Sequence, residues 1–177
     1  MKLPSLCVVD TNVPKTANLK VTPEMDSDLP DDCIDACIDA ITTVMKDRSL
    51  VIDDSDEIVA EYRRQLSMKG QPGVGDVFMK WVHTNAYGLA ECQRVEITKT
   101  DESYEEFPEH DSLSKFDLAD KKFVAVSNAH PKKPAILQAT DTKWWGWREG
   151  LTDVGIKVIF VCQKHIEKKH EDKFGSS

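Results

Sequence analysis

The sequence lacks a long hydrophobic run: no window of the 177 residues approaches the length that a membrane crossing requires. A transmembrane helix needs about twenty consecutive apolar residues, so we expect none in this chain. The opening stretch, MKLPSLCVVD, becomes charged before a long apolar core develops, which is atypical of a signal peptide. These two absences predict a cytoplasmic protein with no membrane association.

An excess of positive charge is also missing. The chain has 23 lysine and arginine residues against 31 aspartate and glutamate residues, which gives a formal net charge of −8. The sequence therefore has no basic tail of the kind that binds DNA, and its non-specific attraction to phosphate should be weak. A nucleic-acid substrate stays possible, because a local basic face or a bound metal ion can override the total charge.

Cysteines are few and have no short paired spacing: Cys7, Cys33, Cys37, Cys92 and Cys162. An odd number without a framework predicts reduced thiols in an intracellular protein. Cys33 and Cys37 lie four residues apart, on one face of an expected amphipathic helix, where packing in the core is the default interpretation. A metal site there would need two more close ligands, and the sequence offers no obvious pair.

Two common catalytic patterns are absent as well. The sequence offers no convincing Ser-His-Asp or Cys-His set for nucleophilic catalysis. The glycine-rich stretch GQPGVG at 70–75 lacks the lysine and the following serine or threonine of a P-loop. The chemistry of the chain is therefore to be sought among its carboxylates.

What the sequence does contain is an alternation of short apolar runs and helical periodicities. This alternation predicts an α/β fold with a central, mostly parallel sheet. Residues 1–165 are expected to form one domain, followed by a charged tail at 166–177, and the last fifteen residues are expected to be a charged tail or a helix. Strands are expected at 6–9, 49–53, 92–98, 135–141 and 156–162, helices at 31–47, 54–66, 74–88, 116–130 and 142–155, and a proline-rich loop at 11–30.

Two of the expected strands end in an aspartate. The run Leu6–Val9 stops at Asp10, and Ile136–Leu137 leads through a short polar step to Asp141. A single aspartate in such a position often caps the helix that follows. The carboxyl ends of parallel strands also form the ligand crevice of open sheets, and two carboxylates at one crevice favour a cation between them.

Further carboxylates occur on two expected helices. Glu61 lies in the second turn of the first of them, and Asp117 and Asp120 share a face of the second. Convergence of these groups with the strand-end aspartates would give a site of oxygen ligands only, which suits Mg²⁺ or Mn²⁺. The alternative is that these are ordinary surface carboxylates in an acidic chain.

Four stretches of the sequence carry a family resemblance, and they occur in the family's order. They are VVDTNV at 8–13, EIVAEYRRQL at 57–66, FDLADKKFVAVS at 116–127 and ILQATD at 136–141. On these motifs the chain resembles the PIN-domain nucleases over residues 6 to about 162. The resemblance implies a PIN-like three-layer sandwich with the sheet in the middle.

The resemblance also implies roles for individual residues. Thr11 and Asn12 would brace the first aspartate and the surrounding water. Asp117 competes with Asp120 for the third ligand position, and Glu57 is a weaker alternative to Glu61. The implied catalytic residues, which would also hold the metal, are Asp10, Glu61, Asp120 and Asp141.

One position departs from the family's pattern. Lys143 stands two residues beyond the last aspartate, where many members carry another acidic residue. A second metal ion is therefore in question, and the lysine is a candidate for holding a phosphate instead. Lys121, Lys143 and Arg148 are the candidate substrate-binding residues because they neighbour the predicted ligands.

Taken together, the carboxylates predict a Mg²⁺- or Mn²⁺-dependent phosphodiesterase, and the resemblance implies an endoribonuclease of toxin or host-defence type. The alternatives are a nuclease for single-stranded or flapped DNA and a non-catalytic PIN-like module that binds proteins. The expected partners are RNA or single-stranded DNA, an inhibitory or complex-forming protein, and a second copy of the chain in a homodimer.

Overall fold

The computed structural model describes residues 2–22, 28–69, 72–90 and 93–175. It is a mixed α/β structure, which confirms the predicted class. The helices and strands are β1 (Cys7–Val9), α1 (Asn12–Asn18), α2 (Asp31–Asp47), β2 (Ile52–Asp53), α3 (Glu57–Gln65), α4 (Val74–Asn85), β3 (Arg94–Val95), α5 (Lys121–Ala129), β4 (Ala135–Gln138), α6 (Thr142–Asp153), β5 (Val158–Phe160) and α7 (Gln163–Phe174), with short 3₁₀ turns at Ala86–Gly88 and Asp111–Leu113.

The centre of the molecule is a small parallel sheet in the order β1-β4-β5. Val8 pairs with Ile136, and Ile136 pairs with Val158. Every residue of β1 and β4 is buried, as expected for parallel strands covered on both faces. The expectation of a mostly parallel sheet is therefore confirmed for these strands.

A second, two-stranded parallel sheet pairs β2 with β3. The segment before β2 also contacts β1, because Cys7 N donates to Ser49 O at 2.8 Å and Val51 N donates to Cys7 O at 2.9 Å. The two sheets are thus joined along one side of β1.

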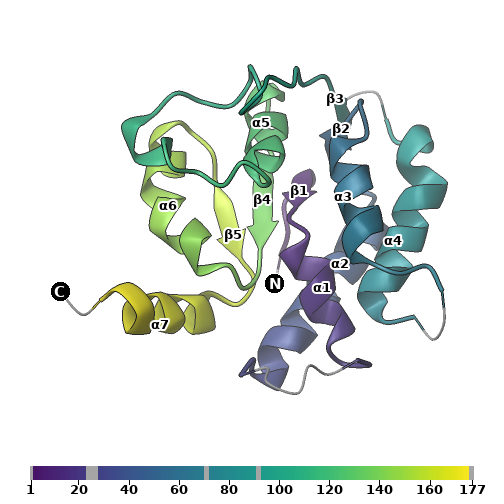
Figure 1. The fold of residues 1–177 in the computed structure, drawn as a ribbon. Coiled ribbons are helices and arrows are strands. Elements are labelled where there is room, and N and C mark those ends of the chain that lie inside the picture. Colours follow the sequence, from purple (N-terminus) through teal and green to yellow (C-terminus); the bar gives the residue numbers. More distant parts are fainter. Residues whose placement is uncertain (1, 23–27, 70–71, 91–92, 176–177) are drawn as a thin grey trace.

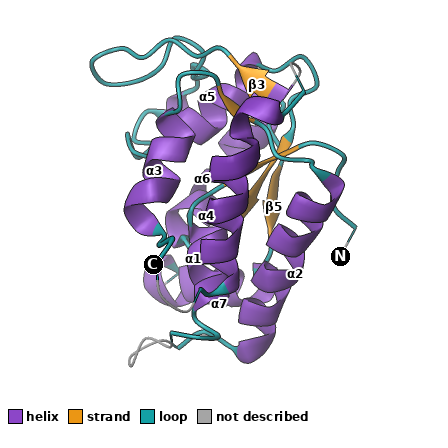
Figure 2. Ribbon diagram, turned by 90° about the vertical axis from the view of Figure 1, so that its right-hand side faces the viewer, coloured by secondary structure: helices purple, strands orange, loops and turns teal. Residues whose placement is uncertain are grey.

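Helices surround the short strands, as Figure 2 shows. In Figure 1, α1, α3 and α4 lie on one side of β1 and β4, and α6 and α7 lie on the other. The helix α2 begins with two aspartates, which suit the positive end of its dipole, and it ends at Arg48 in the left-handed conformation. Among the described residues, no helix combines the length and the apolar composition that a membrane crossing requires.

The helix α1 corrects one expectation, because residues 12–18 were expected to be part of a loop. Pro14 lies in the first turn of this helix, where the backbone N–H groups have no partner within the helix and a proline costs little. Val13 and Ala17 are buried on its inner face. A proline near the start of an apolar pattern therefore does not exclude a helix here.

The C-terminal segment is helical, which is one of the two alternatives expected for it. Residues 166–174 form most of α7, and Ile166 is fully buried against the core. This one apolar side chain, together with the contact between α6 and α7, fixes the helix to the domain.

The cysteines give a second correction. Cys33 and Cys162 form a disulfide, so the expectation of reduced thiols is wrong for this pair. Cys7 and Cys37 are buried free thiols, and Cys92 lies outside the described residues. The pairing joins residues separated by 129 positions in the sequence, which is why spacing alone gave no sign of it.

Candidate functional site

The first strand ends at a buried carboxylate. Asp10 is only 1% exposed, and its backbone N–H donates to Leu137 O at 2.9 Å, which holds it beside β4. Its Oδ1 accepts a hydrogen bond of 2.8 Å from the backbone N–H of Asn12. Pairing of adjacent strands therefore places Asp10 at the carboxyl edge of the sheet, as the sequence predicts.

The neighbour of Asp10 contacts the predicted glutamate. Thr11 Oγ1 donates to Glu61 Oε1 at 2.7 Å, across 50 residues of sequence. The other oxygen of Glu61 forms an ion pair with Lys122, whose side chain is almost completely buried. Thr11 therefore braces the glutamate rather than Asp10.

The alternative glutamate lies elsewhere. Glu57 forms an ion pair of 3.1 Å with Lys99 and accepts a hydrogen bond of 3.2 Å from the hydroxyl of Tyr104. Both partners come from the region that follows β3. The structure thus brings Glu61, and not Glu57, beside the Asp10–Thr11 segment.

A hydrogen bond from α3 fixes this segment further. The hydroxyl of Tyr62 donates to Val9 O at 2.5 Å, and the ring is fully buried. This contact joins the helix that carries Glu61 to the last residue of β1.

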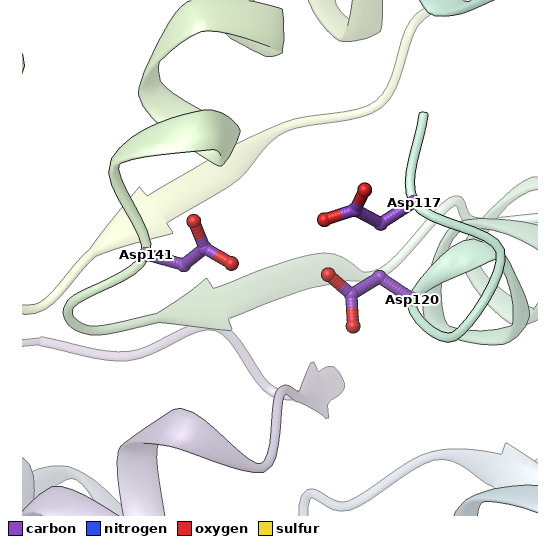
Figure 3. Close-up of side chains that lie close together, drawn as sticks. All are labelled: Asp117, Asp120 and Asp141. Atoms are coloured by element: carbon purple, nitrogen blue, oxygen red, sulfur yellow. The ribbon is translucent and has the colours of Figure 1, made fainter. Parts of the chain in front are cut away.

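Three aspartates gather near the carboxyl end of β4, and their carboxylates point toward one another in Figure 3. Asp117, Asp120 and Asp141 each offer one oxygen, and these oxygens all lie within 4.8 Å of one another. We call these residues the aspartate cluster. Asp10 and Glu61 lie outside it.

Helix starts position this cluster. Asp120 and Asp141 are the N-cap residues of α5 and α6. Asp117 lies in the turn before α5, in which Asp120 N donates to Asp117 O at 3.0 Å. The expectation that Asp117 and Asp120 share a helix face is wrong, because α5 begins only at Lys121, yet the turn brings the two side chains together.

The first turn of α6 supplies three contacts to the cluster. Trp144 Nε1 donates to Asp120 Oδ2 at 3.1 Å, and Lys143 Nζ donates to Asp117 Oδ2 at 2.7 Å. The backbone N–H of Lys143 donates to Asp141 Oδ1 at 2.9 Å. All three aspartates are therefore oriented by one helix turn.

Electrostatics connects the cluster with Asp10. The pKa of Asp10 is raised well above its usual range, chiefly by burial and then by the charges of Asp120, Glu61 and Asp141, while the hydrogen bond from Asn12 opposes the shift. Burial, followed by the charges of Asp141 and Glu61, raises the pKa of Asp120 to about 6, while the hydrogen bond from Trp144 and the charge of Lys122 oppose it. The four predicted carboxylates thus act on one another as one group of negative charges.

The donor set fits a hard divalent cation. All the side-chain donors in the aspartate cluster are carboxylate oxygens, which Mg²⁺ and Mn²⁺ prefer. Oxygens bound directly to one Mg²⁺ lie at most about 4.2 Å apart, so the observed spread closes with small side-chain rotations or a bridging water. A cation there would also relieve the repulsion that raises the pKa values of Asp10 and Asp120.

The predicted substrate-binding residues have different surroundings. Lys143 is half-exposed and next to the cluster. Lys121 Nζ donates to Glu102 O at 3.0 Å and lies over the ring of Phe107. Arg148 lies over Trp145 and lines a separate pocket. Of these three, only Lys143 has a hydrogen bond to the cluster among the described contacts.

Sequence reasoning missed several neighbours of the site. It did not assign Lys122 or Trp144 to the site, although the sequence places Lys122 two residues after Asp120 and Trp144 three residues after Asp141. Lys15 lines a hollow of about 420 Å³ with Asn12 and Thr140, which directly precedes Asp141. Their closeness in sequence to the predicted ligands is the signal that could have identified them.

Comparisons of the chain with protein-family models, curated proteins and solved structures found no match.

Proposed function

We propose that the protein is a Mg²⁺- or Mn²⁺-dependent nuclease that hydrolyses phosphodiester bonds, with its metal held by the aspartate cluster. The observation that carries the proposal is the convergence of Asp117, Asp120 and Asp141 beside the buried Asp10. These residues come from three separate places in the sequence: Asp10 follows β1, Asp117 and Asp120 lie in the turn before α5, and Asp141 follows β4. The resemblance to PIN-domain nucleases, with its three-layer sandwich, is part of this proposal.

The chain's own residues would position the reaction. Asp120 and Asp141 would bind the metal directly, with Asp117 sharing the third position, and Trp144 would keep Asp120 in its rotamer. Thr11 and Lys122 orient Glu61, and Asn12 orients Asp10. The half-exposed ammonium of Lys143 would attract a phosphate. The metal, when bound, would lower the pKa of a water molecule and stabilise the leaving oxygen.

RNA is the proposed substrate, on the strength of the resemblance. The toxin or defence role, the inhibitory partner, the homodimer and the cytoplasmic location are predictions from the same source and from the sequence. Single-stranded or flapped DNA is the alternative substrate, and a module that binds proteins without catalysis is the alternative function.

A cleavage assay on labelled single-stranded RNA and labelled single-stranded DNA tests the proposal. We expect the wild-type protein to cleave single-stranded RNA with Mn²⁺, and EDTA to abolish cleavage. Asp120→Asn and Asp141→Asn should each reduce the rate by about 100-fold or more, because each removes a metal-binding oxygen charge. Asp39→Asn is the matched control, since it removes one exposed carboxylate on α2.

Calorimetry with Mn²⁺ separates the two functions. A nuclease should bind the ion, and Asp120→Asn should weaken that binding while Asp39→Asn leaves it unchanged. Cleavage of DNA but not of RNA would mean that DNA, and not RNA, is the substrate. Absence of both cleavage and metal binding would overturn the proposed nuclease function. The module that binds proteins without catalysis would then be the remaining function.

A further inference from the structure

Three cysteines meet at the contact of α2 with the start of α7. Cys33 is in the first turn of α2, Cys37 is one turn later, and Cys162 is the N-cap residue of α7. The Cys33–Cys162 disulfide has a Cα–Cα distance of 5.2 Å, and Cys37 Sγ lies 3.9 Å from Cys162 Sγ. We call these three residues the cysteine cluster.

A histidine lies beside the cysteine cluster. His165 follows Cys162 on the first turn of α7 and lines a pocket of about 730 Å³ together with Cys33 and Cys162. Its Nε2 is buried, and within the part of the chain that the structure describes this atom has no hydrogen-bond partner. In the tautomer that carries its proton on Nδ1, this nitrogen presents a lone pair, which a metal ion would satisfy.

One pair of these sulfurs has the spacing of two thiolates on a tetrahedral zinc ion. Zn–S bonds of about 2.3 Å place two sulfurs on one ion about 3.8 Å apart, close to the 3.9 Å between Cys37 and Cys162. Two ligands from successive turns of α2 and two from the first turn of α7 complete a Cys₃His set. The sequence showed only the α2 pair, and the fold supplies the two further ligands that a metal site requires.

We propose that the chain binds one zinc ion through Cys33, Cys37, Cys162 and His165 when the disulfide is reduced. Reduction needs a two-electron donor such as a dithiol, which becomes a disulfide itself: two electrons break the Cys33–Cys162 Sγ–Sγ bond, and two protons complete the new thiols. Zinc then displaces the thiol protons to solvent. In the oxidised chain only Cys37 and His165 remain as ligands, so the same residues alternate between a disulfide and a zinc site.

Cys37 is a buried free thiol beside the disulfide. Zinc binds the thiolate form of cysteine, so binding at this residue would displace its proton.

Metal analysis of the full chain tests the proposal. The protein is reduced with a phosphine, which does not bind zinc strongly, and is dialysed with Zn²⁺. We expect about one zinc per reduced chain and almost none in the oxidised chain. Replacement by Co²⁺ should give the visible bands of a tetrahedral ion and the near-ultraviolet band of thiolate-to-cobalt charge transfer.

Matched variants identify the ligands. Cys37→Ser and His165→Gln should each lower zinc affinity by at least about tenfold, while Cys7→Ser and His170→Gln should not. Circular dichroism checks that each variant is folded. If one of the two ligand variants does not fold, the other still tests the site. Asp120→Asn should keep its zinc, which distinguishes this site from the aspartate cluster.

Three outcomes would overturn the zinc site. They are reduced protein without zinc, ligand variants with wild-type affinity, and loss of zinc in Asp120→Asn. Zinc binding does not depend on nuclease activity, so its failure leaves the proposed nuclease untouched.

Discussion

At the scale of single residues, the indole of Trp144 acts on the pKa of one carboxyl group in the aspartate cluster. Its Nε1 donates to Asp120, and this hydrogen bond opposes the rise in the pKa of that carboxyl. Trp144→Phe keeps most of the buried ring but removes the donor. We expect the pKa of Asp120 to rise further and Mn²⁺ affinity to fall by roughly tenfold, measured by calorimetry at neutral pH.

Trp147→Phe is the control for this prediction, because the ring of Trp147 packs on Phe116 without a described contact to the cluster. Equal Mn²⁺ affinity in the two variants would contradict an orienting role for Trp144.

Protonation of Asp120 has a consequence for stability. Its pKa of about 6 in the folded protein exceeds the ordinary value of 3.8, so the folded state binds this proton more tightly than the unfolded state does. The contribution is fully present below 3.8 and is lost as the pH rises through about 6. In urea titrations with a chelator, wild type should lose about 1 kcal/mol more than Asp120→Asn between pH 5 and 7.

The same titrations on Asp39→Asn should follow the wild-type profile, since this variant removes an exposed charge. A parallel profile for wild type and Asp120→Asn would show that Asp120 titrates at its ordinary pKa.

The carboxylates of the candidate site could be proposed from the sequence by their residue type and position. Asp10, for example, follows an apolar run, and the pairing of β1 with β4 then places it at the edge of the sheet. The role of Lys122 was not readable, because the sequence shows a lysine pair and only the helix phase of α5 decides which lysine is buried. Surface and buried lysines look alike until a partner such as Glu61 is placed.

At the scale of elements, α1 and α4 approach closely at a glycine. A Cβ added at Gly75 would lie 2.0 Å from Pro14 O, a backbone atom of α1. Gly75→Ala should therefore push the two helices apart and lower the free energy of unfolding by about 1–3 kcal/mol, measured by urea denaturation. This is the opposite of the usual gain from alanine in a helix.

Gly88→Ala is the matched control, because nothing lies within 4 Å of its added Cβ. We expect a change within about 0.5 kcal/mol for this variant. A Gly75→Ala protein as stable as wild type would mean that α1 and α4 separate without cost.

Element boundaries show where periodicity is a weak guide. The helix α2 was predicted over its full length because apolar residues recur on one face from Cys33 to Val44. The start of α5 was predicted too early, since Phe116 is buried by packing on Trp144 and not by helical phase. An apolar side chain in a turn imitates a helical repeat when the turn folds onto the core.

At the scale of the whole molecule, the disulfide joins the N-terminal end of α2 to the start of α7. Reduction with a phosphine, in the presence of a zinc chelator, should lower the free energy of unfolding by about 2–5 kcal/mol. Urea titrations of oxidised and reduced protein measure this difference. Cys33→Ser should match the reduced protein whether or not reductant is present, and a Cys33→Ser protein as stable as the oxidised wild type would contradict the prediction.

The global arrangement was predictable only in its class. Alternating strands and helices indicated a parallel sheet, because hydrophobic runs and amphipathic periods are local properties of the sequence. The meeting of Cys33 with Cys162 depends on β5 lying beside β4 and on α7 folding back, and both are tertiary facts. No local pattern encodes such a contact across 129 positions.

The disulfide also makes a covalent ring of residues 33–162, which encloses the loops between α2 and the end of β5. A single proteolytic nick anywhere in that ring leaves the two fragments attached to each other. They would migrate as one species on a non-reducing gel and separate only after reduction, whereas a nick outside the ring would release a terminal peptide at once.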